Sequence, residues 1–215
     1  MTRIGFLFDL DGVLIDSESE YTRIWEEIEC RYPTGIPDFA SVIKGMTLDK
    51  ILADYFPDTS TRRGVEYLLY KLEKEMTYRF ASGVENFLEK MIASGIPRVV
   101  VTSSNADKMA HLYNDIPNFR KIFPVIIDSS KVKKSKPDPE GYLLGASSIN
   151  FPAEDCVVFE DSVQGVMAGR NSGAFVVGIC GTKTAKELSP YSDLIVYGFD
   201  ELSISELTKK LEKRK

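Results

Sequence analysis

The chain of 215 residues carries 27 lysines and arginines against 32 aspartates and glutamates, which gives a formal charge of −5 at pH 7. This acidic balance argues against a generally basic nucleic-acid binder and against a protein of anionic membrane surfaces. Hydrophobic residues make up 43% of the sequence and charged residues 27%, which is typical of folded chains and not of disordered ones. We therefore expect one sizeable core, or a core with a smaller satellite domain.

The three cysteines, Cys30, Cys156 and Cys180, are widely spaced and form no CxxC pair. This pattern argues against a disulfide framework and against a structural zinc site. The apolar run at residues 4–8 is too short for a secretory segment or a membrane span. We therefore expect a cytoplasmic monomer that binds neither nucleic acid nor membrane.

Short apolar runs alternate along the chain with stripes of apolar residues at helical spacing. The runs predict six strands, at residues 4–8, 98–101, 125–127, 156–159, 174–179 and 194–196. They are mostly continuous and rich in Val and Ile, as strands buried on both faces are. The alternation predicts an α/β fold, with a Rossmann-like parallel sheet and helices on both of its faces.

About 70 residues between the first two predicted strands contain helical stripes and no convincing strand. The stripes cover residues 21–28, 48–55 and 65–76. A crossover between parallel strands needs only about a dozen residues, so this segment is predicted to be an inserted helical cap domain with its own core. We expect the cap at residues 14–80 and the α/β core at residues 1–13 and 81–215, with hinges near 12–16 and 79–83 that allow opening and closing.

Polar side chains follow four of the predicted strands. They are Asp9 and Asp11 after the first, Thr102 and Ser103 after the second, Lys136 after the third, and Glu160 and Asp161 after the fourth. In a parallel sheet the carboxyl ends of the strands meet at the edge where ligands bind. Each group also has a structural explanation, such as an Asp-Gly turn or a helix cap at Asn105 or Ser162. A calcium loop is excluded, since Val13 and Leu14 stand where such a loop needs an oxygen ligand and a glycine.

Clustered carboxylates repel one another unless a cation lies among them, and Mg²⁺ prefers hard oxygen ligands of this kind. A lysine and a hydroxyl beside the cation would suit a phosphoryl group, whose charge needs positive partners and hydrogen-bond donors. A carboxylate can then act as the nucleophile. The cluster thus favours phosphoryl transfer.

The four motifs, Asp9-Leu10-Asp11-Gly12-Val13, Thr102, Lys136 and Glu160-Asp161, resemble in this order those of the haloacid dehalogenase superfamily, in the branch with a small helical cap. The resemblance implies that Asp9 is the nucleophile and that Asp11 exchanges protons with the leaving group and with water. It implies that Thr102, Ser103 and Lys136 bind the phosphoryl group. It also implies that Mg²⁺ is held by Asp9, the backbone carbonyl of Asp11 and Asp161, with Glu160 assisting through water.

Because it has Asp11, the sequence resembles the phosphoryl-transfer branch of the superfamily. The dehalogenases of the superfamily lack this second aspartate. Within that branch the sequence is similar to the group of β-phosphoglucomutase and small sugar-phosphate phosphatases. However, Tyr21 stands where the mutase has a histidine, and Leu48 stands where it has a phosphate-binding arginine. The resemblance therefore implies a Mg²⁺-dependent phosphatase for a small phosphorylated metabolite, with a sugar phosphate as the expected substrate.

Several alternatives stay open at this point. They are a sugar phosphomutase, a pyrophosphatase or nucleotidase, and a non-catalytic binding module of the same fold. Substrate specificity is expected to depend on cap residues, for which the candidates are Tyr21, Lys44, Gly45 and Lys71.

Overall fold

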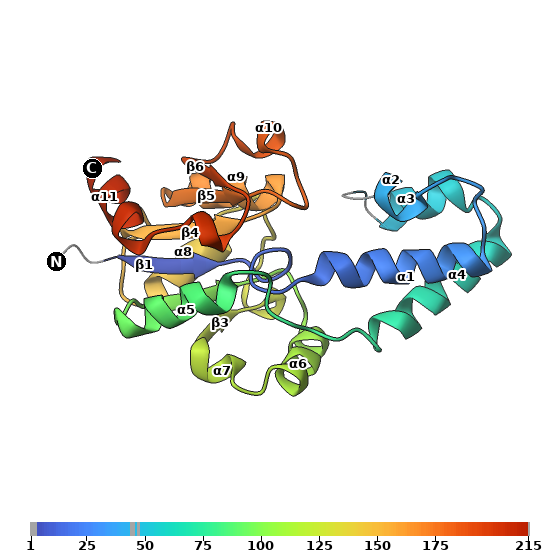
Figure 1. The fold of residues 1–215 in the computed structure, drawn as a ribbon, viewed down its shortest axis with the longest axis horizontal. Coiled ribbons are helices and arrows are strands. Elements are labelled where there is room, and N and C mark those ends of the chain that lie inside the picture. Colours follow the sequence, from blue (N-terminus) through green and yellow to red (C-terminus); the bar gives the residue numbers. More distant parts are fainter. Residues whose placement is uncertain (1–3, 44–45, 47, 215) are drawn as a thin grey trace. The chain divides into compact units, whose positions relative to one another are not determined.

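Two compact units make up the chain in the computed structural model, which describes residues 4–43, 46 and 48–214 (Figure 1). The core unit comprises Met1–Asp16 and Arg79–Lys215, and the helical unit comprises Ser17–Tyr78. The helical unit was predicted at residues 14–80, so its observed bounds differ from the prediction by two or three residues.

The core unit contains one parallel sheet of six strands in the order β3-β2-β1-β4-β5-β6 (Figure 1). The strands are β1 (Gly5–Phe8), β2 (Arg98–Val101), β3 (Val125–Ile127), β4 (Cys156–Glu160), β5 (Phe175–Ile179) and β6 (Leu194–Val196). The six predicted strands and the α/β fold class are confirmed. One difference matters for the site: β4 continues to Glu160, which therefore lies inside the strand and not after it.

Helices connect the strands of the core unit. They are α5 (Val84–Ala93), α6 (Ala106–Asp115), α7 (Phe119–Ile122), α8 (Glu140–Ser148), α9 (Val163–Ser172), α10 (Ala185–Leu188) and α11 (Ile204–Arg214), with 3₁₀ turns η1 (Ser129–Lys131), η2 (Ala153–Asp155) and η3 (Phe199–Glu201). The side chain of Asn105 caps α6 and that of Ser162 caps α9, as predicted. The turns and the four-residue helices are too short to display a 3.6-residue period, so apolar periodicity could not predict them.

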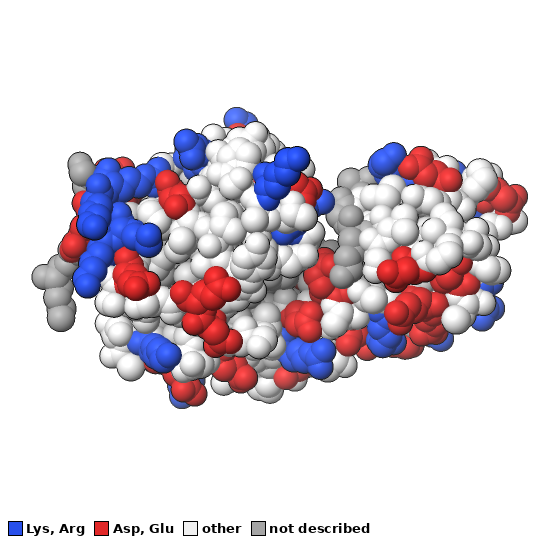
Figure 2. All heavy atoms as spheres, turned by 45° about the horizontal axis from the view of Figure 1, so that its top comes forward, with Lys and Arg blue, Asp and Glu red and all other residues white. Residues whose placement is uncertain are grey.

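Lysine and arginine side chains gather at the end of the core unit where α11 lies (Figure 2). Lys209, Lys210, Lys213 and Arg214 are all exposed there. Arg214 also forms a salt bridge of 3.2 Å with Asp193. Lys213 and Arg214 lie in the last turn of α11, where cations interact favourably with the helix dipole. No helix in the described ranges combines the length and the apolar character needed to cross a membrane.

Both faces of the sheet are buried, and alternate residues of each strand face opposite sides. On one side Leu7 and Val158 pack in a cluster with Tyr142 of α8 and Ala168 of α9. On the other side lie the rings of Phe6, Phe8 and Phe159, in contact with Phe87 of α5 and Phe199 of η3. The predicted arrangement of helices on both faces is therefore confirmed.

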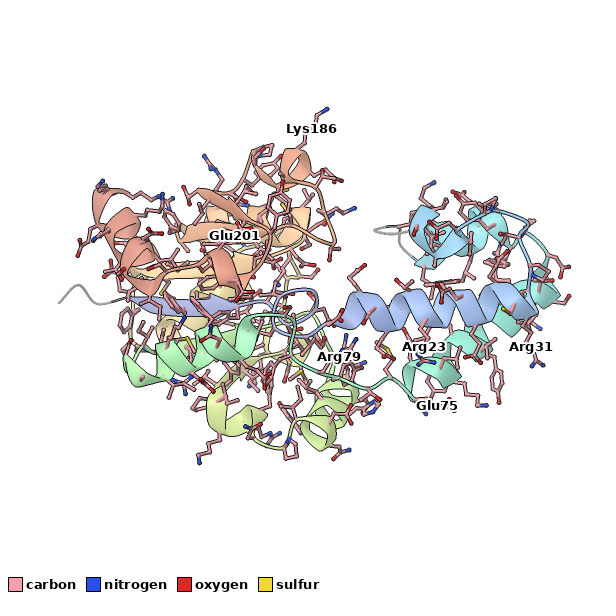
Figure 3. All side chains as sticks on the ribbon, in the orientation of Figure 1. Arg23, Arg31, Glu75, Arg79, Lys186 and Glu201 are labelled. Atoms are coloured by element: carbon pink, nitrogen blue, oxygen red, sulfur yellow. The ribbon has the colours of Figure 1, made fainter. Side chains whose placement is uncertain are left out.

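The chain leaves the core unit after Asp16 and returns to it at Arg79, and the two segments are paired with each other. Ile15 forms an isolated antiparallel bridge with Phe80. The backbone N–H of Asp16 donates to the carbonyl of Arg79 at 3.1 Å, and the two side chains form a salt bridge of 3.3 Å (Arg79 is labelled in Figure 3). Leu14 and Ile15 are fully buried and belong to the core unit.

The helical unit consists of α1 (Ser17–Arg31), α2 (Phe39–Val42), α3 (Leu48–Tyr55) and α4 (Thr59–Glu73). It has a small core of its own, in which Ile24, Trp25 and Ile28 of α1 are buried. The ring centroids of Trp25 and Phe39 are 6.0 Å apart, and those of Phe39 and Phe56 are 5.9 Å apart. The inserted segment is therefore an independently packed helical element.

The strand order places the topological switch point between β1 and β4, because the chain adds strands on one side of β1 first and then on the other. Ligands of open parallel sheets bind at the carboxyl ends of the strands at such a point. Asp9 follows β1 there, and Glu160 ends β4.

Candidate active site

Buried polar side chains are concentrated at the switch point. In the described part of the chain, the buried polar or charged residues are Asp9, Ser17, Thr102, Glu160 and Asp161. All but Ser17 lie at the carboxyl ends of β1, β2 and β4. Burying a charged group is costly unless it is paired or coordinates a metal, so this concentration marks a functional site.

The turn after β1 is shaped by a close approach of its backbone to Asp161. The N–H of Asp9 donates to the carbonyl of Phe159 at 3.0 Å, which extends the pairing of β1 with β4 by one bond. Gly12 has a φ of +70°, and a Cβ at this position would lie 2.0 Å from Oδ2 of Asp161. Glycine is therefore required both for the left-handed conformation and for the space.

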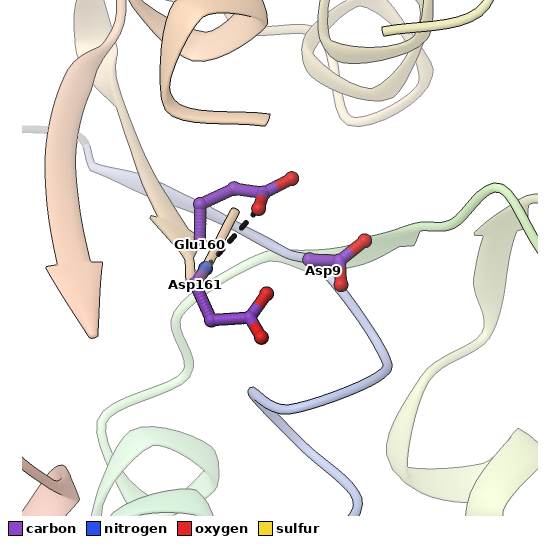
Figure 4. Close-up of side chains that lie close together, drawn as sticks. All are labelled: Asp9, Glu160 and Asp161. Carbon is purple, nitrogen blue, oxygen red and sulfur yellow. Dashed lines mark hydrogen bonds between the residues drawn. The ribbon is translucent and has the colours of Figure 1, made fainter. Parts of the chain in front are cut away.

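Asp9, Glu160 and Asp161 form a compact acidic group (Figure 4). Each offers a carboxylate oxygen, and these three oxygens lie within 4.8 Å of one another. Burial raises the pKa of Asp9 to about 7 and that of Asp161 to about 8, and the charges of neighbouring carboxylates act in the same direction. The hydroxyl of Thr182 hydrogen-bonds to Asp161 and opposes this shift. A cation among these oxygens would stabilise their ionised forms.

Lys136 supplies one positive charge to this group. Its Nζ donates to Oδ1 of Asp9 at 2.5 Å, to Oε1 of Glu160 at 2.6 Å and to the carbonyl of Val101 at 3.2 Å. Burial disfavours the ammonium form, but the charges of Asp9 and Glu160 more than offset this, so the pKa of Lys136 is raised. When all three carboxylates are ionised, their negative charges exceed the single positive charge of Lys136 by two, which a divalent cation would balance.

Glu160 is held by protein donors on both of its oxygens. Oε1 accepts from Lys136 and from the hydroxyl of Tyr142 at 2.7 Å. Oε2 accepts from the N–H of Asp161 at 3.1 Å, and from the N–H and hydroxyl of Ser162 at 3.3 and 3.0 Å. Glu160 is in phase with Val158, so it faces α8 and α9. This fully buried carboxylate is thus an acceptor for protein groups on both oxygens.

We expect Gly165→Ala to impair the site, because a Cβ on Gly165 of α9 would lie 1.9 Å from Oε1 of Glu160 and 2.0 Å from Oε2. Glu160 can move away only by breaking its hydrogen bonds, and overpacking of this kind costs about 1–3 kcal/mol. The expected result is a lower free energy of unfolding and a loss of activity of about tenfold or more, measured by urea denaturation and phosphate release.

Gly169→Ala is the matched control for this change. It adds the same methyl group to the same helix, where the Cβ would meet Val158 Cγ1 at 3.0 Å and no charged group among its three nearest atoms. Equal activity in the two variants would contradict the importance of the Glu160 position.

The side chain of Asp11 is turned toward α6 and lies outside the acidic group. Its Oδ2 accepts from the hydroxyl of Ser104 at 3.0 Å, and its Oδ1 forms an ion pair with Nζ of Lys108 at 2.5 Å. Sequence reasoning singled out neither donor as functional. A signal existed at Lys108, since a cation in the first turn of a helix is unfavourable without an acidic partner.

Thr102, Ser103 and Lys136, the predicted phosphate-binding residues, line one pocket of about 230 Å³ together with Tyr142. The hydroxyl of Thr102 accepts from the N–H of Ser104 at 3.0 Å, which shapes the turn after β2. Ser103 is exposed, whereas Thr102 is buried. Asp9, Glu160 and Asp161 are not among the lining residues of this pocket, so the link to the acidic group is Lys136, which lines the pocket and also contacts Asp9 and Glu160.

The four predicted specificity residues belong to a different part of the chain. Tyr21 on α1 donates from its hydroxyl to Glu73 at 3.0 Å. Lys71 on α4 is exposed and lies 4.0 Å from Glu75. Lys44 and Gly45 lie outside the described residues. Their roles in substrate selection stay predictions.

Two other side chains that can be reactive, a cysteine and the histidine, lie outside the acidic group. Cys156 is fully buried in β4, and burial raises the pKa of its thiol to about 12. His111, the single histidine, lies on α6 with Nε2 3.7 Å from Asp115. Neither residue is part of the acidic group.

The sequence is similar to those of known phosphatases. The chain is 27% identical over 207 residues to hexitol phosphatase A of Escherichia coli (strain K12), covering 94% of each chain. It is 29% identical over 191 residues to validoxylamine A 7'-phosphate phosphatase of Streptomyces hygroscopicus subsp. limoneus, covering 85% of this chain and 88% of the relative.

Solved structures agree with respect to the fold. The crystal structure of a HAD family hydrolase from Deinococcus radiodurans R1 with bound phosphate and sodium matches with a TM-score of 0.82 at 23% identity, covering 98% of this chain and 97% of that one. The family described as haloacid dehalogenase-like hydrolase matches residues 6–179, a range that contains all seven residues predicted to form the site in the core unit. The chain therefore belongs to the haloacid dehalogenase-like hydrolase family of enzymes.

Proposed function

We propose that this enzyme is a Mg²⁺-dependent phosphatase that hydrolyses a small phosphomonoester, in particular a sugar phosphate, through an aspartyl-phosphate intermediate. The observation that carries the proposal is the position of Lys136, which contacts Asp9 and lines the same pocket as Thr102 and Ser103. The phosphatases named among the relatives support the reaction class.

The proposed Mg²⁺ ligands are carboxylate oxygens of Asp9 and Asp161 and the backbone carbonyl of Asp11. The donor set fits this ion, since it consists of oxygens, and since the buried carboxylates have raised pKa values without a cation. When bound, Mg²⁺ would supply positive charge next to the transferring phosphoryl group. Because both oxygens of Glu160 accept from protein donors, we assign it to the support of Lys136 in addition to any water-mediated contact with the ion.

In the proposed first step, a carboxylate oxygen of Asp9 attacks phosphorus while the bond from phosphorus to the leaving oxygen breaks. Asp11 gives a proton to that leaving oxygen. In the second step, water attacks the phosphorus of the aspartyl phosphate and gives a proton back to Asp11, which frees inorganic phosphate and restores Asp9. Lys136 and the hydroxyls of Thr102 and Ser103 stabilise the phosphoryl oxygens in both steps.

Water, and not a sugar hydroxyl, is the proposed acceptor of the phosphoryl group. Tyr21 and Leu48 stand where β-phosphoglucomutase has a histidine and a phosphate-binding arginine, and these differences weigh against phosphomutase activity. We assign the activity to the cytoplasm, where the three free cysteines would stay reduced. The proposed substrate is a small metabolite.

The proposal predicts that inorganic phosphate is released from phosphorylated sugars and polyols in the presence of Mg²⁺ and is not released in EDTA. The measurement is phosphate release across a panel of sugar phosphates, polyol phosphates, nucleotides and pyrophosphate. Preference for nucleotides or pyrophosphate would retain the mechanism but replace the substrate class.

Two results would contradict the proposal. Isomerisation of a sugar phosphate primed with a bisphosphate, without free phosphate, would establish a mutase. Absence of both reactions across the panel would favour a non-catalytic binding module.

A further inference from the structure

Each of the three donors of the Lys136 ammonium group has an acceptor, and in the proposed mechanism the contact with Asp9 is exchanged for one with a phosphoryl oxygen. A lysine has three N–H groups, and three acceptors surround Nζ: Asp9, Glu160 and the carbonyl of Val101. The position of the ammonium group therefore depends on the positions of these three acceptors. The Val101 carbonyl belongs to β2, and Asp9 is the proposed nucleophile, whose bonding changes during the reaction. Glu160 is the side-chain acceptor that keeps its bonding throughout.

The two oxygens of Glu160 are held differently. Three donors from the end of β4 and the start of α9 fix Oε2. Oε1 contacts Lys136 itself and the hydroxyl of Tyr142. In the described residues, Tyr142 is therefore the donor that fixes the Lys136 end of the carboxylate independently of Lys136.

Tyr142 is rigidly placed by the packing of α8 on the sheet. Its side chain is 1% exposed and packs in the cluster that contains Leu7 and Val101. Gly141 and Gly145 of the same helix lie against Val101, since a Cβ on either would be 2.9 or 3.0 Å from its methyl groups. This close approach brings the hydroxyl within 2.7 Å of Glu160. The Lys136 ammonium also lies 5.1 Å from the centroid of the Tyr142 ring.

From this geometry we propose that Tyr142 is a positioning residue whose hydroxyl, acting through Glu160, holds the ammonium of Lys136 beside Asp9. The inference rests on the proposed phosphatase function, in which Lys136 binds the phosphoryl group. Without the hydroxyl, Oε1 keeps Lys136 as its single partner, and the carboxylate and ammonium can shift together away from the phosphoryl site. Small displacements of a positioning group lower the rate strongly.

Tyr142→Phe separates this role from simple packing, because it keeps the buried ring and removes one oxygen. We expect kcat/KM for 4-nitrophenyl phosphate with Mg²⁺ to fall about tenfold, the effect of one hydrogen bond to a charged group. Inhibition by inorganic phosphate is expected to weaken as well, because Lys136 binds phosphoryl oxygens in the proposed mechanism. The thermal midpoint is measured on the same samples.

A double-mutant cycle with Glu160→Gln tests whether Tyr142 acts through Glu160. In the Glu160→Gln protein, adding Tyr142→Phe is expected to change kcat/KM by less than about twofold, because residues that act as one unit are not additive. Tyr113→Phe is the control, since Tyr113 lies on α6 and is half-buried against Phe119 and Arg120. It is expected to keep full activity.

Two outcomes would overturn the inference: activity of Tyr142→Phe within twofold of the wild type, or a full tenfold loss again in the Glu160→Gln background. A third outcome concerns the proposed function instead. If the wild-type enzyme releases no phosphate from any ester with Mg²⁺, the phosphatase proposal fails, and the inference falls with it. The wild-type rate thus tests the function, and the ratios between variants test the role of Tyr142.

Discussion

Replacing Asp9 by asparagine is expected to reduce phosphate release by roughly a thousandfold or more, because the amide cannot act as the nucleophile. The two side chains have nearly the same size and shape, so the sheet edge should keep its packing. Lys136 loses its charged partner at Asp9 but keeps Glu160 and the carbonyl of Val101. The measurement is steady-state phosphate release with Mg²⁺, combined with a search for the covalent phosphoenzyme by mass spectrometry in the wild type and the variant.

Asp107→Asn is the matched control for this prediction. Asp107 is an exposed carboxylate in the first turn of α6, and the same substitution there removes one negative charge from the same unit. It is expected to retain activity within about twofold, as is usual for surface substitutions. Activity of Asp9→Asn close to that of the control would rule out Asp9 as the nucleophile.

The strands of the core unit could be predicted because each is a continuous run of β-branched and aromatic residues buried on both sides. The same pattern placed Asp9, Thr102 and Asp161 at one edge, since parallel strands all end at the same edge. This inference needed no knowledge of strand order. The structure adds that β1 and β4 are neighbours, which brings Asp9 close to Asp161.

The partners of these residues could not be predicted in the same way. Tyr142 occupies an apolar stripe, so its pattern indicates a core residue, and its bond to Glu160 spans 18 positions. Lys108 reaches Asp11 across 97 positions. Thr182 follows β5 in a loop with no periodic pattern. Such contacts depend on how close two elements pack, which the apolar pattern of each element does not determine.

The end of β4 shows how one residue of difference changes an interpretation. With the strand ending at Phe159, Glu160 and Asp161 were an acidic pair beyond the strand, both available to a metal. With Glu160 inside the strand, it follows the alternation and faces α8 and α9, whereas Asp161 lies against the turn at Gly12. Burial by the helices explains why Glu160 is 0% exposed and satisfied by protein donors.

Mg²⁺ is expected to raise the thermal midpoint of the wild-type protein, and Asp161→Asn is expected to abolish both that rise and the activity. A ligand at about 100 times its Kd stabilises the native state by about 2.7 kcal/mol. For a protein of this size each kcal/mol corresponds to about 2–4 °C, so the expected rise is roughly 5–10 °C. The measurement is a thermal melt at a fixed pH with Mg²⁺ and with EDTA, and phosphate release from the same preparations.

The thermal midpoint of Asp161→Asn in EDTA distinguishes loss of a metal ligand from loss of the fold. Asp9 and Asp161 are buried close together, so their ionised forms are disfavoured in the absence of a cation. Asp161→Asn removes one of these charges and is therefore expected to be at least as stable in EDTA as the wild type. Asp107→Asn should keep the full Mg²⁺ response. If Asp161→Asn still responded to Mg²⁺ as the wild type does, Asp161 would not be a metal ligand; if it melted far below the wild type in EDTA, its carboxylate would have a structural role that outweighs the repulsion.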